Sequence, residues 1–275
     1  MRSAHRIGAG VALRTLESAS AVGGSGATLV FLHGRGHASV LWAPLLAAFS
    51  GSRRVIALDL PGFGRSGAPP VDGRGIEYFV GPIEDALATV ERPVLVGHSL
   101  GGYVALEIAL RRRRELAGLV LVDAMGIAET IPLAARAYLR FGPERLARLR
   151  GLTHPFGSRD ATRIRWTEDD AVNAARLAPL REELLRSRGT RARAREAFAA
   201  AMQTNVRDRL HEIDAPTLLV WGDQDETFPL PHAIHARTRI AGSELARVDA
   251  GHSPHLARSV TVTRALAGWL ERRSL

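Results

Sequence analysis

The sequence contains no cysteine, no lysine and few aromatic residues. The lack of cysteine excludes disulfide bonds, thiolate catalysis and zinc–cysteine sites. Aromatic residues make up 5% of the 275 residues, a shortage that argues against nucleic-acid binding by base stacking, although the formal net charge is +9. No apolar run reaches the roughly 18 residues of a membrane-spanning helix, and no secretory h-region stands near the N-terminus. We therefore expect a cytoplasmic globular protein without nucleic-acid or membrane partners.

All 37 basic residues are arginine, and their excess over acidic residues is local. Residues 129–211 hold 17 arginines against 10 acidic residues, whereas the charges elsewhere nearly balance. Such arginines ordinarily solvate the outer faces of helices. Attraction of an anionic substrate to this stretch is the alternative that stays open. The sequence makes no prediction of the oligomeric state.

Short apolar runs rich in β-branched residues recur along the chain, with helical patterns between them. This alternation predicts an α/β protein whose parallel sheet is covered by helices on both faces. One or two edge strands are expected before residue 27, and a final helix over Pro254–Glu271. The other predicted strands are Ala27–His33, Arg54–Leu60, Pro93–Gly97, Leu119–Asp123, Thr217–Gly222 and Leu245–Val248, with helices over 39–50, 77–91 and 100–114.

The alternation stops between residues 124 and 214, where the sequence is rich in arginine, alanine and leucine and has helical patterning. This stretch lies between two predicted strands of the same sheet, so it predicts a helical cap inserted into the sheet domain. We expect a core formed by residues 1–124 and 214–275, and a cap, or lid, formed by residues 125–213.

Gly97-His98-Ser99-Leu100-Gly101 matches the pattern G-x-S-x-G between a predicted strand and a predicted helix. In such a turn a strained serine holds its hydroxyl at the head of a helix, where backbone N–H groups face developing negative charge. Ser99 is therefore the candidate nucleophile, and a structural Gly–Ser turn is the alternative. His98 is expected to point away from the pocket.

A serine nucleophile needs a general base and an acidic residue that orients the base. His252 directly follows the last predicted strand and is the candidate base, whereas His255 is expected to be a packing residue. Asp225, in the loop after the preceding strand, is the preferred acid. Asp123 and Asp223 are the alternatives.

An oxyanion hole needs two backbone donors. The N–H of Leu100 is one candidate, and the N–H of Arg35 is the other. Gly34 and Gly36 flank Arg35 and let the backbone approach a substrate oxygen closely, so Gly34 is also a candidate for substrate binding. Phe141 and Trp166, among the few large rings of the predicted cap, are further candidates for substrate binding, with a core role as the alternative for each.

Two further patterns could indicate a dinucleotide-binding site and a metal site, but their contexts do not support either. Gly62–Gly67 satisfies the dinucleotide fingerprint G-x-G-x-x-G, but the Ala68–Gly73 segment that follows cannot open a helix, so we expect a structural loop there. His252/His255 and His232/His235 have the spacing of ligand pairs without a convincing third ligand. We therefore predict no metal site and no cofactor.

Five motifs occur in sequence along the chain: LHGRG at 32–36, DLPGFGRSG at 59–67, VGHSLGG at 96–102, WGDQD at 221–225 and GHSPH at 251–255. These motifs and their order resemble those of the α/β-hydrolase superfamily. The resemblance covers nearly the whole chain and implies an eight-stranded, mostly parallel sheet with a helical cap after the sixth strand. It supports Ser99, Asp225 and His252 as a catalytic triad, with Arg35 and Leu100 at the oxyanion hole. Relatives that open epoxides or displace halides resemble proteins with an aspartate nucleophile, so we do not expect those reactions here.

The expected function is hydrolysis of a small-molecule carboxylic ester through an acyl-enzyme formed on Ser99. Hydrolysis of a lactone and hydrolysis of a carbon–carbon bond in a ring-cleavage product are alternatives that use the same site. Relatives with carbon–carbon activity tend to carry a tryptophan shortly after the catalytic histidine, a position that Ser253, Pro254 and His255 fill here. A small-molecule receptor built on a hydrolase fold is the alternative from another class.

Overall fold

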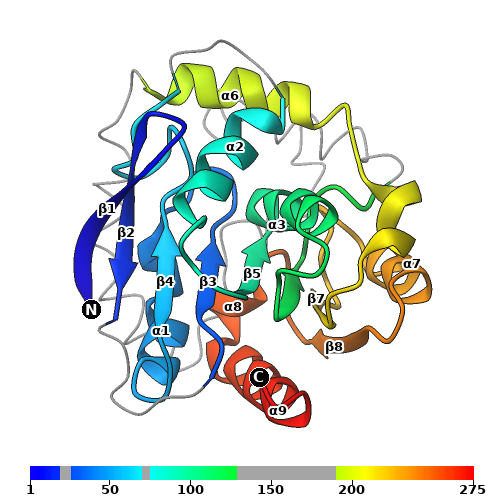
Figure 1. The fold of residues 1–275 in the computed structure, drawn as a ribbon. Coiled ribbons are helices and arrows are strands. Elements are labelled where there is room, and N and C mark those ends of the chain that lie inside the picture. The colour runs from blue at the N-terminus through cyan, green and yellow to red at the C-terminus, as the bar shows by residue number, and fades with distance from the viewer. Residues whose placement is uncertain (19–25, 70–74, 129–189) are drawn as a thin grey trace, which may run out of the picture.

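The computed structural model describes residues 1–18, 26–69, 75–128 and 190–275, with side chains in the last range from residue 194. One eight-stranded sheet has the order β1-β2-β4-β3-β5-β6-β7-β8 (Figure 1). β2 is antiparallel to β1 and β4, whereas β3 to β8 all run parallel. The predicted mostly parallel sheet is confirmed. Its strands are β1 (Arg2–Gly8), β2 (Val11–Glu17), β3 (Leu29–Leu32), β4 (Val55–Leu58), β5 (Val94–His98), β6 (Gly118–Val122), β7 (Thr217–Gly222) and β8 (Glu244–Val248).

Helices cover both faces of this sheet (Figure 1). One face packs against α2 (Glu77–Ala86), α3 (Leu100–Arg111) and α7 (Pro231–Arg239), together with α6 (Thr190–Ala201) and the 3₁₀ helix η2 (Arg207–Glu212). The other face packs against the 3₁₀ helix η1 (Ser39–Trp42), α1 (Ala43–Phe49), α8 (Pro254–Ala257) and α9 (Ser259–Arg272). The helices on both faces explain why the central strands are apolar on both sides.

Side chains of the central strands alternate between these two cores. In β3, Leu29 and Phe31 pack in the core under α1 and α9, whereas Val30 and Leu32 pack in the core under α2 and α3. All four are fully buried. Because successive side chains of a strand point to opposite faces of the sheet, β3 contributes to both cores. Burial on both faces explains why its sequence is a continuous apolar run.

Three helix predictions need correction, and one helix was missed. The helix expected over 77–91 ends at Ala86, because Leu87 leaves the helical region at φ −99° and ψ 2°. The helix expected over 100–114 ends at Arg111. The helix expected over Pro254–Glu271 is two helices, because Arg258 leaves the helical region at φ −141° and ψ 49° between α8 and α9. Sequence analysis missed α7, which forms the crossover that parallel strands β7 and β8 require.

The described ends of the predicted cap pack against the core. Ile127 follows β6, Phe198 lies on α6 and Leu210 lies on η2, and all three are buried in the cluster under α2 and α3. Phe141 and Trp166, predicted to bind substrate, lie outside the described residues. The boundaries of the cap therefore stay a prediction.

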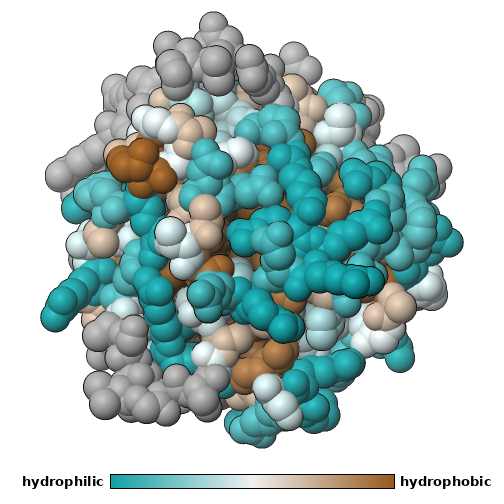
Figure 2. Space-filling view, in the orientation of Figure 1, coloured by the Kyte–Doolittle hydropathy of each residue, from teal (hydrophilic) through white to brown (hydrophobic). Residues whose placement is uncertain are grey.

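The surface in the view of Figure 1 is largely hydrophilic, with hydrophobic side chains in small separate patches (Figure 2). Arg111 at the end of α3 pairs with Glu77 on α2, and Arg113 pairs with Glu212 on η2. Among the described helices, none is both long enough and apolar enough to cross a membrane.

Candidate active site

Ser99 stands in the tight turn between β5 and α3. Its φ of 52° and ψ of −115° lie where residues other than glycine are rare and strained. Three backbone hydrogen bonds hold this conformation: the N–H of Ser99 donates to Val122, and its carbonyl accepts from Tyr103 and Met125. The nearly buried hydroxyl is thereby held at the carboxyl edge of the sheet, beside the N-terminus of α3.

Two glycines make this turn possible because other chain segments approach them closely. A Cβ atom on Gly97 would lie 2.4 Å from the carbonyl oxygen of Gly101. A Cβ atom on Gly101 would lie 2.2 Å from the carbonyl oxygen of Leu32 on β3. Both contacts are with backbone atoms, which cannot rotate away as a side chain can. The glycines of the motif therefore permit the close packing of β5, α3 and β3.

Replacing Gly101 with alanine is expected to lower the free energy of unfolding by about 3 kcal/mol, because the new methyl group overlaps the Leu32 carbonyl. Urea denaturation with unchanged m value would measure the loss. The matched control is Gly81→Ala within α2, where nothing lies within 4 Å of the added Cβ. That variant is expected to stay within about 1 kcal/mol of wild type, because the better helix propensity of alanine is opposed by the clash of its Cβ with the ring of Pro82, the next residue. Equal stability of the two variants would contradict the packing argument.

Ser99, His252 and Asp225 form a continuous chain of hydrogen bonds. The Oγ of Ser99 lies 3.1 Å from Nε2 of His252, and Nδ1 of His252 lies 2.9 Å from Oδ2 of Asp225. A carboxylate only accepts hydrogen bonds, so Nδ1 carries the ring proton and Nε2 presents its lone pair to the hydroxyl. Imidazole in this tautomer can remove a proton from Ser99.

The loop after β7 holds Asp225 in place. Its side chain is buried, and its Oδ1 accepts hydrogen bonds from the backbone N–H groups of Thr227 (2.7 Å) and Phe228 (3.0 Å). Asp223, two residues earlier, is exposed and pairs with Arg247. Of the three acids considered from the sequence, Asp225 is thus the one that hydrogen-bonds the ring of His252.

Asp123 is a second buried carboxyl beside this chain. It follows β6 with a φ of 42°, and its Oδ1 accepts the N–H of Gly222 at 2.9 Å. One of its oxygens lies within 4.8 Å of nitrogens of His98 and His252. Burial, and then the nearby charge of Asp225, raise the pKa of Asp123 well above its ordinary value. The charged form of Asp123 is therefore disfavoured in the folded chain.

The loop after β3 brings its backbone against Ser99. A Cβ atom on Gly34 would lie 2.6 Å from Nδ1 of His98 and 3.2 Å from the Cβ of Ser99, so a larger residue would have to displace the His98 ring. Arg35 follows directly, and Gly36 continues the loop with a φ of 73°. Leu100 is the first residue of α3, so its N–H has no carbonyl one turn earlier within the helix. Gly34 thus lies against Ser99, Arg35 follows Gly34 in the same loop, and Leu100 follows Ser99 at the start of α3.

Sequence analysis missed two buried side chains that support this loop. His33 accepts the N–H of Leu60 at 2.9 Å through Nε2 and donates through Nδ1 to the carbonyl of Gly34 at 2.7 Å. Asp59 accepts the N–H groups of Ser39 (2.6 Å) and Arg65 (2.9 Å). Both residues lie within the quoted LHGRG and DLPGFGRSG motifs, so the motifs could have indicated them before the structure was known. They join the loop after β3 to the loop after β4.

The backbone groups of the Gly62–Gly67 loop form hydrogen bonds within the loop and with β2. The N–H of Gly62 donates to Gly67, and the N–H of Gly67 donates to Ala12 on β2. No helix begins in its described continuation through Pro69. These contacts are those of a structural loop, as predicted.

The side chain of Arg35 links the loop after β3 to α6. Its guanidinium carbon lies 5.2 Å from the centre of the Phe198 ring, within the range of a cation–π interaction. Phe198 lies within the predicted cap, and sequence analysis does not single it out for the site. Its contact with Arg35 places part of α6 beside the residues that border Ser99.

Comparison with known proteins gives consistent matches. The profile of the alpha/beta hydrolase family matches residues 29–265. An uncharacterized protein of Mycobacterium tuberculosis (strain ATCC 25618 / H37Rv) is 32% identical over 247 residues, covering 85% of this chain and 72% of that protein. A pimeloyl-[acyl-carrier protein] methyl ester esterase of Aromatoleum aromaticum is 30% identical over 239 residues, covering 83% and 92%. The crystal structure of the enol-lactonase from Burkholderia xenovorans LB400 has a TM-score of 0.76 at 22% identity, covering 98% and 100%.

Proposed function

Because the chain belongs to the α/β-hydrolase family, we propose that it hydrolyses small-molecule carboxylic esters through an acyl-enzyme formed on Ser99. The observation that carries this proposal is the hydrogen-bonded chain from Ser99 through His252 to Asp225. The similarity to a protein named as a methyl ester esterase adds support for the ester class.

In the acylation step, His252 takes the proton of the Ser99 hydroxyl through Nε2 as Oγ attacks the ester carbonyl carbon. The backbone N–H groups of Arg35 and Leu100 stabilise the negative charge that develops on the carbonyl oxygen. The protonated imidazole then donates its proton to the departing alkoxide, which leaves as an alcohol. The acyl group remains bound to Ser99.

In the deacylation step, a water molecule attacks the acyl-enzyme while His252 takes its proton. The carboxylic acid product leaves when Oγ recovers a proton from the imidazolium, and it then releases its own proton to the solvent. Asp225 holds the tautomer of His252 in both steps, and it stabilises the imidazolium by its negative charge. This sequence of steps needs only the residues of the chain, the ester and water.

In this proposal residues 125–213 form a cap that borders the acyl or alcohol side of the substrate. The contact between Arg35 and Phe198 supports this arrangement, because it joins the loop next to Ser99 with α6. The described side chains near Ser99 also include Phe228, whose ring centre lies 5.3 Å from that of His252. Apolar walls of this kind favour an uncharged acyl group near the reacting carbon.

The test is hydrolysis of a p-nitrophenyl ester series from acetate to decanoate, combined with labelling by a p-nitrophenyl organophosphate. We expect turnover with an optimum chain length, loss of turnover after labelling, and a phosphoryl adduct on the peptide that contains Ser99. Addition of the best ester should slow the labelling, because both reagents use the same hydroxyl. A folded protein that hydrolyses none of the esters would reject the ester class, and an adduct on another residue would reject the nucleophile.

A further inference from the structure

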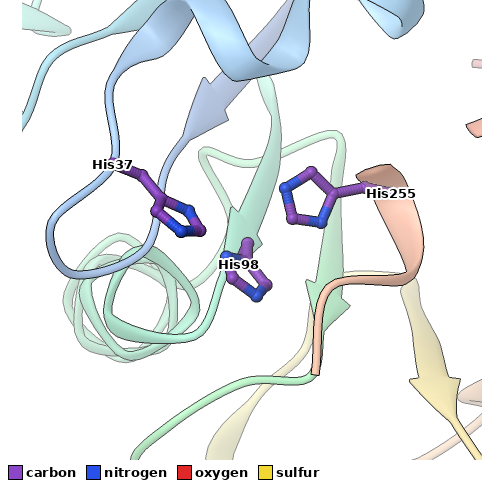
Figure 3. Close-up of side chains that lie close together, drawn as sticks. All are labelled: His37, His98 and His255. Atoms are coloured by element: carbon purple, nitrogen blue, oxygen red, sulfur yellow. The ribbon is translucent and has the colours of Figure 1, made fainter. Parts of the chain in front are cut away.

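Three histidine side chains from different segments lie close together (Figure 3). His37 comes from the loop after β3, His98 is the last residue of β5, and His255 lies on α8. One nitrogen from each ring lies within 4.8 Å of the other two. The ring centres of His98 and His255 are 4.3 Å apart, and those of His37 and His98 are 5.5 Å apart. The fold thus gathers three imidazoles from segments far apart in the sequence.

Four ring nitrogens of this cluster are buried without a hydrogen-bond partner among the described residues: Nδ1 of His37, Nδ1 of His98, and both nitrogens of His255. Buried polar atoms are nearly always paired, and each unpaired one typically costs about 1–3 kcal/mol. The rings pack instead against one another and against Trp42, whose ring centre is 4.4 Å from that of His255. An ion that bound these nitrogens would remove the free-energy cost of leaving them unpaired.

The hydrogen bond made by His98 fixes which of its nitrogens can act as a ligand. Its Nε2 lies 2.7 Å from the backbone carbonyl of His252, so Nε2 carries the proton and the lone pair is on Nδ1. A histidine that donates one N–H to a backbone carbonyl while offering its other nitrogen is the usual arrangement in metal sites.

The charge state of the cluster suits a cation. Burial, with smaller effects from neighbouring histidines and Arg35, lowers the pKa of His37 to about 3. Burial also lowers the pKa of His98 and of His255 well below their ordinary values. All three imidazoles are therefore neutral at neutral pH. The neutral form is the one that binds metal ions.

We propose that His37, His98 and His255 form a binding site for one divalent transition-metal ion of the Zn²⁺ type. Three imidazole nitrogens are a ligand set that such ions accept, with a fourth position for water. Zn–N bonds of about 2 Å place tetrahedral ligand atoms about 3.3 Å apart, so the nitrogens need to close by up to about 1.5 Å. His37 can supply this movement, because it stands on the loop after β3 and not within a helix or strand.

This site departs from the expectation that no metal is bound. The sequence paired His255 only with His252, which stands three residues earlier. The structure turns His252 toward Ser99 and Asp225 and surrounds His255 with His37 and His98 instead. The proposed ion would use none of the three residues of the hydrogen-bonded chain, so its binding is separable from hydrolysis.

The test uses the full chain without a histidine tag, stripped with EDTA and dialysed against Zn²⁺, followed by metal analysis. We expect one Zn²⁺ per chain, and a visible absorption band typical of tetrahedral coordination when Co²⁺ replaces Zn²⁺. His37→Ala is expected to weaken the affinity about 100-fold or more, whereas His5→Ala, which removes an exposed histidine of β1, should leave it unchanged. Ser99→Ala should also bind one ion, which keeps this result independent of the proposed hydrolysis.

Two outcomes would overturn the site. One is binding of less than about 0.1 ion per chain at micromolar Zn²⁺, since three-histidine sites bind more tightly than this. The other is equal affinity in wild type and in a folded His37→Ala variant. Because His37 stands on a partly exposed loop, its variant should fold, and a rise in the melting temperature of wild type with Zn²⁺ that is absent from His37→Ala provides a second readout.

Discussion

Replacing Ser99 with alanine is expected to lower kcat for the best p-nitrophenyl ester by about 10⁴- to 10⁶-fold. The variant loses the oxygen that forms the acyl-enzyme, while His252 and the backbone donors of Leu100 and Arg35 stay in place. Residual hydrolysis would come only from water activated by His252 in the pocket. Steady-state kinetics at saturating ester measures the loss, and circular dichroism with a melting curve confirms that the variant is folded.

The matched control is Ser253→Ala. Ser253 is adjacent to His252 and precedes α8, but its hydroxyl makes no capping hydrogen bond to that helix. It is therefore a serine of the same region whose side chain takes no part in the proposed chemistry, and we expect its kcat within a few-fold of wild type. Wild-type turnover in Ser99→Ala would refute the proposed nucleophile. A comparable loss in both variants would point to damage of the His252 loop.

Asp225→Asn is expected to lower kcat by about 10⁴-fold, because an asparagine amide can donate to Nδ1 of His252 and so favours the wrong ring tautomer. Asp123→Asn is expected to lower it less than about 10-fold. The raised pKa of Asp123 disfavours its charged form, and the asparagine oxygen can still accept the N–H of Gly222. The ratio of kcat in the two variants measures which carboxyl serves as the acid. A larger loss in Asp123→Asn would reverse the assignment.

The raised pKa of Asp123 also gives a test by stability. Ionising this carboxyl is harder in the folded chain than in the unfolded one, so wild type loses stability as the pH rises above the unfolded value of about 4 toward the folded value. Asparagine cannot ionise and removes this contribution. Urea midpoints should therefore show Asp123→Asn more stable than wild type at pH 8, with the difference vanishing near pH 4. A difference independent of pH would contradict the raised pKa.

The central sheet was predictable because its strands are buried on both faces. Runs such as Leu29–Leu32 and Thr217–Gly222 leave little ambiguity when helical patterns separate them. α7 escaped prediction because its sequence, PHAIHARTR, is mostly polar and buries only Ala233 and Ala236. The topology could have predicted α7, because two adjacent parallel strands such as β7 and β8 need a long crossover connection.

The candidate site was predictable where a motif fixes local backbone geometry. The flanking glycines indicated Ser99, and the position of His252 after the last strand indicated the base. The choice among Asp123, Asp223 and Asp225 needed three-dimensional information, because all three follow strands that end at the same edge of the sheet. The histidine cluster was not predictable, because His37 and His255 are 218 positions apart and share no pattern.

The distance along the chain between Ser99 and His252, 153 positions, has a consequence for protein synthesis. A ribosome that adds about 5–20 residues per second makes Ser99 roughly 8 to 30 s before His252. During that interval the nascent chain holds the hydroxyl without its base, and β7 and β8, which carry Asp225 and His252 to it, are not yet complete. Under the proposed mechanism, a newly made chain therefore cannot form an acyl-enzyme before nearly all of its sheet has been translated.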